Sequence, residues 1–373
     1  MLTRELGKSG VKVGEIGLGT EHLKSADKKI TKSIVDKAVE SGVNYFDMLF
    51  NLPCYLTNFG EAFKLYRSRL VLASHIGSSE RNGQYYKTRN VVDCEKTLNH
   101  TLKALGTDYI DVANVHYIKD MKEYRAVLAP NGVVDFAEKL KRTGKAHLRG
   151  ISTHDTQVVI DAAKSGRFDV VTFHVNFANN ALPHRNEALA VCAKNGVGVV
   201  AMKPFAGGTL LMNNSTVRVS AIRKGGGKTV KLAIPHNMTP TRCLSYTLAQ
   251  IGVQVALPGV SNLNELQQIL AYPEASAEDK DYSQVLEGFK EYVDGQCVYC
   301  NHCLPCPVGI DIGKTTRLLD AAQHGSNAVI KQEYNQLKGN ASNCTGCNSC
   351  VKRCPFNVDV VANMKKAVEL FDH

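Results

Sequence analysis

Short apolar runs alternate with stretches whose apolar positions recur every three or four residues, from about residue 14 to residue 272. The runs predict buried strands, and the stretches predict amphipathic helices. Predicted strands cover residues 16–20, 43–47, 70–77, 109–116, 147–152, 169–175, 196–204 and 253–259. Predicted helices cover residues 30–41, 92–105, 157–164, 186–194, 241–251 and 262–270. This order indicates an α/β fold, in which eight parallel strands close into a (β/α)8 TIM barrel.

Three segments fall outside this alternation. Residues 2–13, with Gly10 at their centre, predict a small hairpin that caps the bottom of the barrel. Residues 206–234 form a long connection after the seventh strand, and connections of this length are usually functional or mobile. Residues 279–293 predict a helical link to the C-terminal part. We therefore expect a barrel domain over residues 1–278 and a second, smaller domain over residues 279–373.

The length of 373 residues suits a barrel of about 250 residues with an appendage. The first residues are polar and no apolar run reaches about 18 residues, so we expect a cytoplasmic protein without a secretory signal or a membrane span. The net charge of +10 would suit an anionic partner. However, the basic residues are scattered and form no nucleic-acid-binding motif, so nucleic acid is not an expected partner.

Eight of the twelve cysteines lie in two compact groups near the C-terminus. The first group is C-V-Y-C-N-H-C-L-P-C-P, and the second is C-T-G-C-N-S-C-V-K-R-C-P. Spacings of two residues let three sulfurs surround one iron–sulfur cluster, while the fourth cysteine, before proline, typically binds the other cluster. We expect two [4Fe–4S] clusters, one held by Cys297, Cys300, Cys303 and Cys354, the other by Cys344, Cys347, Cys350 and Cys306.

Zinc is the alternative metal, because it also binds paired cysteines. Eight cysteines with a proline after each fourth one favour clusters. The module resembles a two-cluster ferredoxin domain of the α-helical kind, since residues 312–338 between the groups look helical. Two neighbouring clusters suit a relay of single electrons in an oxygen-poor, anaerobic setting. Clusters that only stabilise the fold remain the alternative.

The barrel resembles the aldo-keto reductase family. The segments that carry the resemblance are GVNYFD at 42–47, LGTDYIDVANVH at 105–116, GKAHLRGIS at 144–152, VVAMKPFAGGTL at 199–210 and VALPGVSNLNEL at 255–266. Members that carry a C-terminal cluster domain resemble this chain from end to end. The resemblance implies carbonyl reduction by NADPH at the C-terminal ends of the strands, with a tetrad of Asp, Tyr, Lys and His.

Only part of this tetrad is present. Asp47 and His116 match the family Asp and His, but His75 stands where the family has Lys, and Leu52 stands where it has Tyr. The expected catalytic residues are Asp47, His75, His116, Lys203, which ends the seventh strand, and Tyr55, which is close enough to replace the missing Tyr. With His154 and His174 they make a histidine-rich barrel mouth, suited to acid–base chemistry or alternatively to metal binding.

The cofactor side of the barrel also departs from the family pattern. Ser152 matches the residue that holds the nicotinamide carboxamide, and His174, Gly259 and Asn262 are further expected cofactor-binding positions. Glu265 stands near the family Arg that binds the 2′-phosphate, and a carboxylate there would repel a phosphate. This argues against NADP(H). A flavin is an alternative, since barrels often bind phosphate after strands seven and eight.

The leading hypothesis is an iron–sulfur oxidoreductase with a small-molecule substrate in the barrel mouth. The two clusters would relay electrons to or from it, with ferredoxin or another redox protein as partner. The first alternative is an NADPH-dependent carbonyl reductase with a non-standard tetrad, in which Tyr55 or His75 replaces the usual acid. The second is a non-catalytic electron-transfer subunit.

Overall fold

The structure, a computed structural model, describes most of the chain. The described residues are 1–179, 182, 184–212, 216–223, 226–233, 238–287, 295, 297–301, 303–323 and 328–372. The chain divides into two compact units. Unit 1 comprises Met1–His174, Val197–Pro204 and Gln254–Glu274, and unit 2 comprises Val175–Gly196, Phe205–Val253 and Ala275–His373.

Eight parallel strands form the central sheet. In chain order they are β3 (Leu18–Gly19), β4 (Tyr45–Met48), β5 (Val71–Ile76), β8 (Ile110–Ile118), β9 (Ala146–Thr153), β10 (Val170–His174), β11 (Gly198–Met202) and β14 (Val253–Leu257). Neighbours pair in the order β14-β11-β10-β9-β8-β5-β4-β3. Bridges from Ile16 to Ala256 and from Gly19 to Gly259 join the two ends of this row, so the predicted barrel is confirmed.

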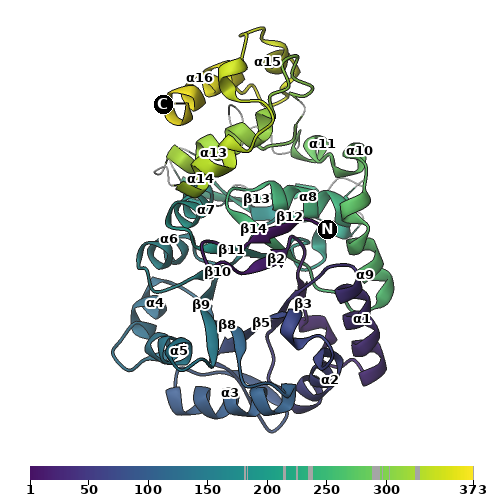
Figure 1. Cartoon of the computed structure of the whole chain (residues 1–373), viewed down its shortest axis with the longest axis vertical. Helices are drawn as coiled ribbons and strands as arrows, with labels where there is room; N and C mark the ends of the chain where they lie inside the picture. The colour runs from purple at the N-terminus through teal and green to yellow at the C-terminus, as the bar shows by residue number, and fades with distance from the viewer. Residues whose placement is uncertain are drawn as a thin grey trace. The chain divides into compact units, whose positions relative to one another are not determined.

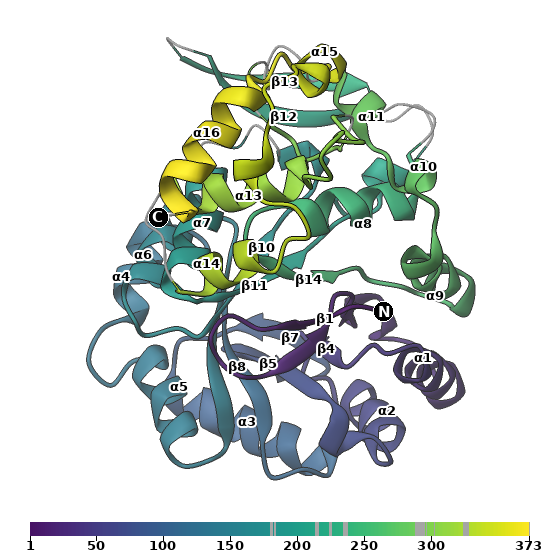
Figure 2. The same ribbon diagram turned by 45° about the horizontal axis from the view of Figure 1, so that its top comes forward.

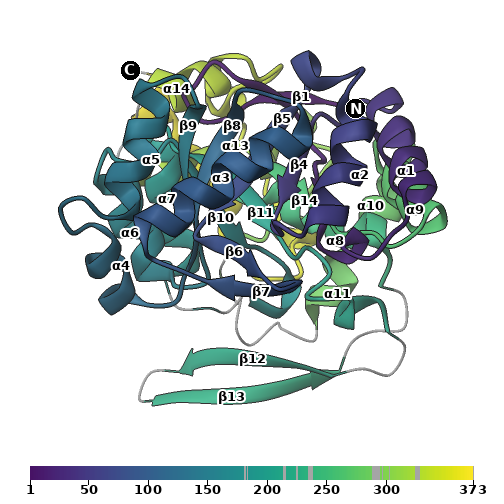
Figure 3. The same ribbon diagram turned by 90° about the horizontal axis from the view of Figure 1, so that it is seen from below.

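Helices follow the strands, because each strand buried on both faces needs a covering layer. In unit 1 they are α1 (Lys28–Glu40), α2 (Pro53–Phe63), α3 (Val91–Leu105), α4 (Met121–Val127), α5 (Val133–Arg142), α6 (Thr156–Lys164) and α9 (Leu263–Leu270). Figure 3 shows α1, α2 and α3 outside β4 and β5. The side chains of Asn90 and Asp155 cap the free amides at the starts of α3 and α6.

Two hairpins accompany the barrel strands. The predicted N-terminal hairpin forms from β1 (Thr3–Glu5) and β2 (Lys12–Gly14), and Leu6 in its turn packs into the barrel core. The second hairpin, from β6 (Ser78–Arg81) and β7 (Gln84–Lys87), was not expected from the sequence. It leaves β5 at Gly77, where φ is +95° and a Cβ atom would lie 2.7 Å from the carbonyl oxygen of Thr88. Glycine is therefore required at the base of this hairpin.

Unit 2 holds α7 (Arg185–Asn195), α8 (Pro240–Ala249) and the C-terminal helices. The long connection at residues 206–234 contains an antiparallel ribbon of β12 (Thr216–Arg223) and β13 (Gly226–Ala233), seen in Figure 3. Residues 213–215, 224–225 and 234 of this connection lie outside the described residues. So do residues 288–293 of the predicted helical link, of which α10 (Ala277–Lys280) and α11 (Ser283–Glu287) form the described part.

The C-terminal part of unit 2 is helical, as predicted. Its helices are α13 (Ile312–Gln323), α14 (Ala328–Asn335), α15 (Ser349–Arg353) and α16 (Val360–Phe371), drawn in light green to yellow in Figure 1. Helix α13 packs against α16 and also against α7 (Figure 2). Within the described part of the chain, the helices lack the length and apolar character needed to cross a membrane.

Candidate functional site

Three of the expected catalytic residues lie in direct contact at the C-terminal ends of neighbouring strands. Asp47, His75 and His116 come from β4, β5 and β8, and all three are buried. The Nε2 atom of His75 lies 3.0 and 3.2 Å from the two carboxylate oxygens of Asp47. The Nδ1 atom of His75 lies 3.0 Å from Nδ1 of His116. The strand ends thus join a carboxylate and two imidazoles in one row.

A bulge in β8 sets the direction of the second histidine. The pairing of β8 with β9 shifts register between Val115 and Ile118, and Tyr117 adopts a φ of +24°. His116 and Tyr117 therefore lie in the irregular part of the strand. Bulges of this kind re-aim side chains and are common beside active sites.

The row continues to Tyr85, which the sequence reasoning missed. Its hydroxyl lies 2.6 Å from Nε2 of His116, and it comes from β7 of the unexpected hairpin. Asn114 also borders the row, since its Nδ2 atom donates to Thr172 Oγ1 at 3.0 Å and lies 3.5 Å from Nε2 of His75. The spacing of Tyr85 along the chain gives no hint of this contact, because only the folded hairpin produces it.

With an ionised Asp47 and a neutral His75, the direction of each hydrogen bond in the row follows from the chemistry of the partners. An ionised Asp47 only accepts, so His75 must carry its proton on Nε2 and donate to the carboxylate. A neutral His75 then accepts at Nδ1, and His116 donates to it from its own Nδ1. Nε2 of His116 is left as an acceptor, so the Tyr85 hydroxyl donates to it. The row is therefore a continuous series of hydrogen bonds from the Asp47 carboxylate to the Tyr85 hydroxyl.

Burial decides the charge state of the second histidine. Burial, with added repulsion from His75, Arg89 and Lys87, lowers the pKa of His116 to about 2. Burial and the nearby Lys203 lower the pKa of His154 to about 4. Both imidazoles are therefore neutral at physiological pH, which suits proton transfer more than binding of an anion.

These lowered pKa values predict acid destabilisation of unit 1. Between pH 6.5 and 4 the unfolded chain binds protons at His116 and His154, whereas the folded chain does not. We therefore expect the free energy of unfolding to fall as the pH falls through this window. Urea unfolding followed by far-ultraviolet circular dichroism should show a shallower pH slope in H154Q. The exposed-site control H100Q should keep the wild-type slope, and equal slopes in all three proteins would contradict the assignment.

Tyr55, expected as a replacement for the missing family Tyr, contacts Thr20, whose hydroxyl donates to the backbone carbonyl oxygen of Asp47. It is buried in α2, its hydroxyl bonds Thr20 Oγ1, and burial raises its pKa. Leu52 is the N-cap residue of the same helix, and its side chain makes no capping hydrogen bond. The Tyr55 ring also contacts those of Phe50 and Phe59.

The remaining strand-end residues form a second group. Nζ of Lys203 lies 3.4 Å from Nε2 of His154, whose ring packs edge-on against that of His174, with 4.6 Å between the ring centroids. Tyr117 lies between this group and the row, because its ring contacts those of both His116 and His154. In the described residues, no three His, Cys, Asp or Glu side chains converge closely enough to hold a single metal ion.

Polar side chains in the loop after β14 and in the first turn of α9 form hydrogen bonds with one another and with nearby backbone amides. Asn262 caps α9 by accepting from the Glu265 amide at 2.9 Å, and the Glu265 carboxylate accepts from the amide and hydroxyl of Ser261 at 2.7 and 2.8 Å. A helix N-terminus commonly binds phosphate, but here the Asn262 side chain takes the Glu265 amide and the Glu265 carboxylate takes the Ser261 amide. At Gly259 a Cβ atom would lie 2.6 Å from the ring of His22. On β9, Ser152 is buried.

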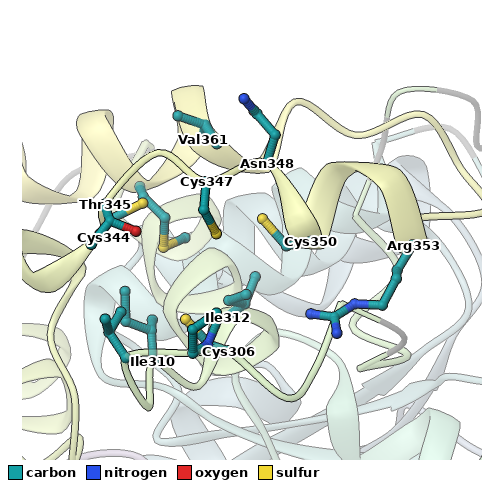
Figure 4. Close-up of a pocket in the computed structure, with 13 residues that line it drawn as sticks. Cys306, Ile310, Ile312, Cys344, Thr345, Cys347, Asn348, Cys350, Arg353 and Val361 are labelled. Atoms are coloured by element: carbon teal, nitrogen blue, oxygen red, sulfur yellow. The ribbon is translucent and has the colours of Figure 1, made fainter.

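The second cysteine group lines a hollow in unit 2. Cys344, Cys347 and Cys350 face Cys306 of the first group across it, as Figure 4 shows. The apolar wall includes Ile310, Ile312, Val361 and Met364. These four thiols in an apolar setting fit the donor set of a [4Fe–4S] cluster, whose thiolates bind different irons and so stand apart. Cys347 is exposed, which places this cluster site at the surface of its unit.

The first cysteine group has Cys354 as its neighbour. Burial raises the pKa of the Cys303 thiol to about 12, and the nearby Cys300, Cys354 and Cys350 add to the rise. Arg353 joins the two cysteine groups by donating to the carbonyl oxygens of Cys303 at 2.5 Å and of Pro305 at 2.8 Å. A buried thiol with other thiols close by is stable as a thiolate beside a cationic metal, so Cys303 and its neighbours also fit a cluster.

Comparison with known proteins places these features in a family. The sequence matches the model of the aldo/keto reductase family over residues 15–287. The chain belongs to the aldo/keto reductase family. Residues 296–359 match the model of a 4Fe-4S dicluster domain. Together with relatives that are named as oxidoreductases, these matches make the protein an aldo/keto reductase-type oxidoreductase with an iron–sulfur domain.

Two relatives and one solved structure each match about three quarters of the chain or slightly less. The uncharacterized oxidoreductase YqkF of Bacillus subtilis is 26% identical over 288 residues, which are 72% of this chain and 90% of that protein. The L-glyceraldehyde 3-phosphate reductase of Escherichia coli K12 is 24% identical over 286 residues, 70% of this chain and 80% of that protein. Among solved structures, the aldo-keto reductase AKR11C1 from Bacillus halodurans shares the fold with a TM-score of 0.60 and 21% identity, covering 78% of this chain and 96% of its own.

Proposed function

We propose that this aldo/keto reductase transfers electrons between a ferredoxin-type protein and a small carbonyl or hydroxyl substrate in the barrel mouth. When bound, the two clusters supply single electrons, and two such transfers reduce one carbonyl. The barrel residues bind the substrate and move the protons. The observation that carries the proposal is a series of side-chain contacts within unit 2, which leads from the first cysteine group to the segment that follows β10.

This series consists of three aromatic rings. Phe177, three residues after the end of β10, stacks on Tyr246 with 4.1 Å between the ring centroids. Tyr282 contacts both rings edge-on, at 5.8 Å from Phe177 and 5.5 Å from Tyr246. Its hydroxyl donates to the carbonyl oxygen of Val298 at 2.9 Å, and Val298 adjoins Cys297. Packed rings and one hydrogen bond thus connect the strand-end segment to a cluster ligand.

The loop after β14 also supports the proposal, because it is poorly suited to bind the 2′-phosphate of NADPH. Aldo/keto reductases typically use NADPH, but Glu265 places a carboxylate in the loop where a 2′-phosphate would approach. The amides of Ser261 and Glu265 already bond to side chains of this loop. A phosphate would have to displace these bonds and meet a negative charge, so binding is expected to be weak.

Anaerobic titration of the full-length protein with three reductants tests the proposal. Reduced ferredoxin, NADPH and NADH are added separately, and cluster reduction is followed by visible absorption and electron paramagnetic resonance. We expect reduced ferredoxin to reduce the clusters and each nicotinamide nucleotide to leave them oxidised. Methylglyoxal serves as the probe carbonyl for turnover, and its consumption is expected with ferredoxin as the reductant.

The variant C300A tests the electron route, and C54S is its matched control. It lacks one expected ligand of the first cluster and should lose ferredoxin-driven consumption of methylglyoxal, whereas C54S, at an exposed cysteine outside the module, should keep it. NADPH-driven turnover that survives in C300A would overturn the proposal and favour a nicotinamide-dependent reductase.

A further inference from the structure

The Tyr85 hydroxyl is the outermost donor of the row that begins at Asp47. We propose that Tyr85 is the residue that gives a proton to the substrate oxygen, and that His116 and His75 then restore this proton from the Asp47 end. The inference rests on the proposed function, which places a carbonyl substrate in the barrel mouth and names the reductant. It assigns the acid to a residue that comes from a different element than the family Tyr, whose position holds Leu52.

The hairpin that carries Tyr85 is held firmly at its base. Ser78 donates from its hydroxyl to the carbonyl oxygen of Leu49 at 2.6 Å, and Asn51 donates to the carbonyl oxygen of Ser78 at 2.8 Å. Beyond β7, Arg89 donates to the carbonyl oxygen of His116 at 2.6 Å. These bonds join the hairpin to the loop after β4 and to the end of β8. Tyr85 is thus positioned from both sides.

The Tyr85 ring lies beside the loop in which the family carries its acid. It packs edge-on against Phe50, two residues before Leu52, with 5.8 Å between the ring centroids. Tyr85 is 42% exposed, whereas its partner His116 is only 5% exposed. One side of the phenol is therefore open to a substrate while its oxygen contacts the buried row. Burial, offset by Arg89 and reinforced by Glu21, raises the pKa of Tyr85, which keeps the phenol protonated.

One added proton reverses the His75–His116 and His116–Tyr85 hydrogen bonds, while His75 still donates from Nε2 to Asp47. When the Asp47–His75 pair holds that proton, His75 donates from Nδ1 to Nδ1 of His116. His116 then carries its own proton on Nε2 and donates to the Tyr85 oxygen, so the phenol O–H is free to point outward. After Tyr85 gives up its proton, the phenolate takes one from His116, His116 takes one from His75, and the row returns to its first state. Each step moves one proton over a hydrogen bond.

The reaction balances with one proton from this row. Carbonyl reduction consumes two electrons and two protons and forms one O–H and one C–H bond. The row supplies the proton of the O–H bond, the ferredoxin-type reductant supplies the electrons, and solvent supplies the proton of the C–H bond. The opposite direction uses the same row, with Tyr85 accepting the hydroxyl proton of the substrate.

The test compares Y85F with Y86F, which removes a hydroxyl from the next residue of the same strand. The side chain of Tyr86 packs against Arg81 and is not part of the row. With reduced ferredoxin and methylglyoxal, we expect Y85F to lower kcat by about 10²-fold with little change in KM, because general acid catalysis typically contributes at least this much. Y86F should keep the wild-type kcat. Equal kcat values in the two variants would overturn the proposal.

A second measurement needs no turnover and separates this proposal from the proposed function. In the protein labelled with ¹⁵N-histidine, nuclear magnetic resonance should show His75 protonated on Nε2 and His116 on Nδ1 at neutral pH. In Y85F the Nε2 resonance of His116 should shift, because it loses its hydrogen-bond donor, and in Y86F it should not. A His116 that carries its proton on Nε2 in the resting protein would overturn the proposed row, whatever reduces the clusters.

Discussion

Alanine at both Cys306 and Cys344 is expected to leave about four irons per chain, whereas alanine at both Cys306 and Cys297 is expected to leave almost none. The first pair removes two ligands from the same cluster if ligation is crossed between the cysteine groups, and the second pair removes one ligand from each cluster. Crossed ligation is what the hollow suggests, because Cys306 faces the three cysteines of the other group there.

Iron and sulfide analysis of the anaerobically purified variants measures this directly. The wild-type chain and the C54S control should hold about eight irons. If ligation stayed within each cysteine group, the two double variants would exchange their results, because Cys306 and Cys297 would then share a cluster. Alanine is the better substitution here, since a serine oxygen can still bind iron.

Asparagine at position 47 is expected to lower kcat for methylglyoxal with reduced ferredoxin by about 10³–10⁴-fold. The amide can either accept from or donate to Nε2 of His75, so it no longer fixes the tautomers of the two histidines. The amide also cannot hold the proton that returns the row to its protonated state. A comparable loss accompanies removal of a carboxylate that orients a catalytic histidine in other enzymes.

The matched control for D47N is D93N, on the barrel helix α3 and outside the row. D93N should keep the wild-type kcat, and both variants should keep about eight irons, because neither position belongs to the cysteine module. If D47N retained more than about a tenth of the wild-type kcat, Asp47 would have no essential part in proton transfer.

The barrel could be predicted from the sequence because parallel strands buried on both faces appear as continuous apolar runs. The strand predicted at 169–175 and the helix predicted at 92–105 match β10 and α3 to within a residue. Helices α2, α4 and α5 and the hairpin of β6 and β7 were missed. The hairpin strands are short and mostly polar, so neither periodicity nor apolar runs distinguish them from a loop.

The candidate site was predictable only where its residues end strands. Asp47, His75 and His116 follow from that position, since the ends of parallel barrel strands meet at one face. The place of Tyr85 in the site could not be predicted in this way. Its contact with His116 depends on how the hairpin turns back at Gly77 and where Arg89 anchors it. Tyr55 looked suitable from its distance along the chain, but the direction of α2 buries its hydroxyl against Thr20.

The turn at Gly77, at the base of the β6–β7 hairpin, has a consequence for how the substrate selectivity of this enzyme could change in evolution. The hairpin of β6 and β7 lies between a strand and the next helix, and in the described part of the chain β5 is its one partner among the barrel strands. Away from Tyr85 and from the bonds that anchor its base, the length and sequence of the hairpin can therefore vary while the barrel strands keep their pairing. Selectivity in such a lineage would evolve in these variable hairpin positions, while Tyr85, the Asp47 carboxylate and the two imidazoles stayed unchanged.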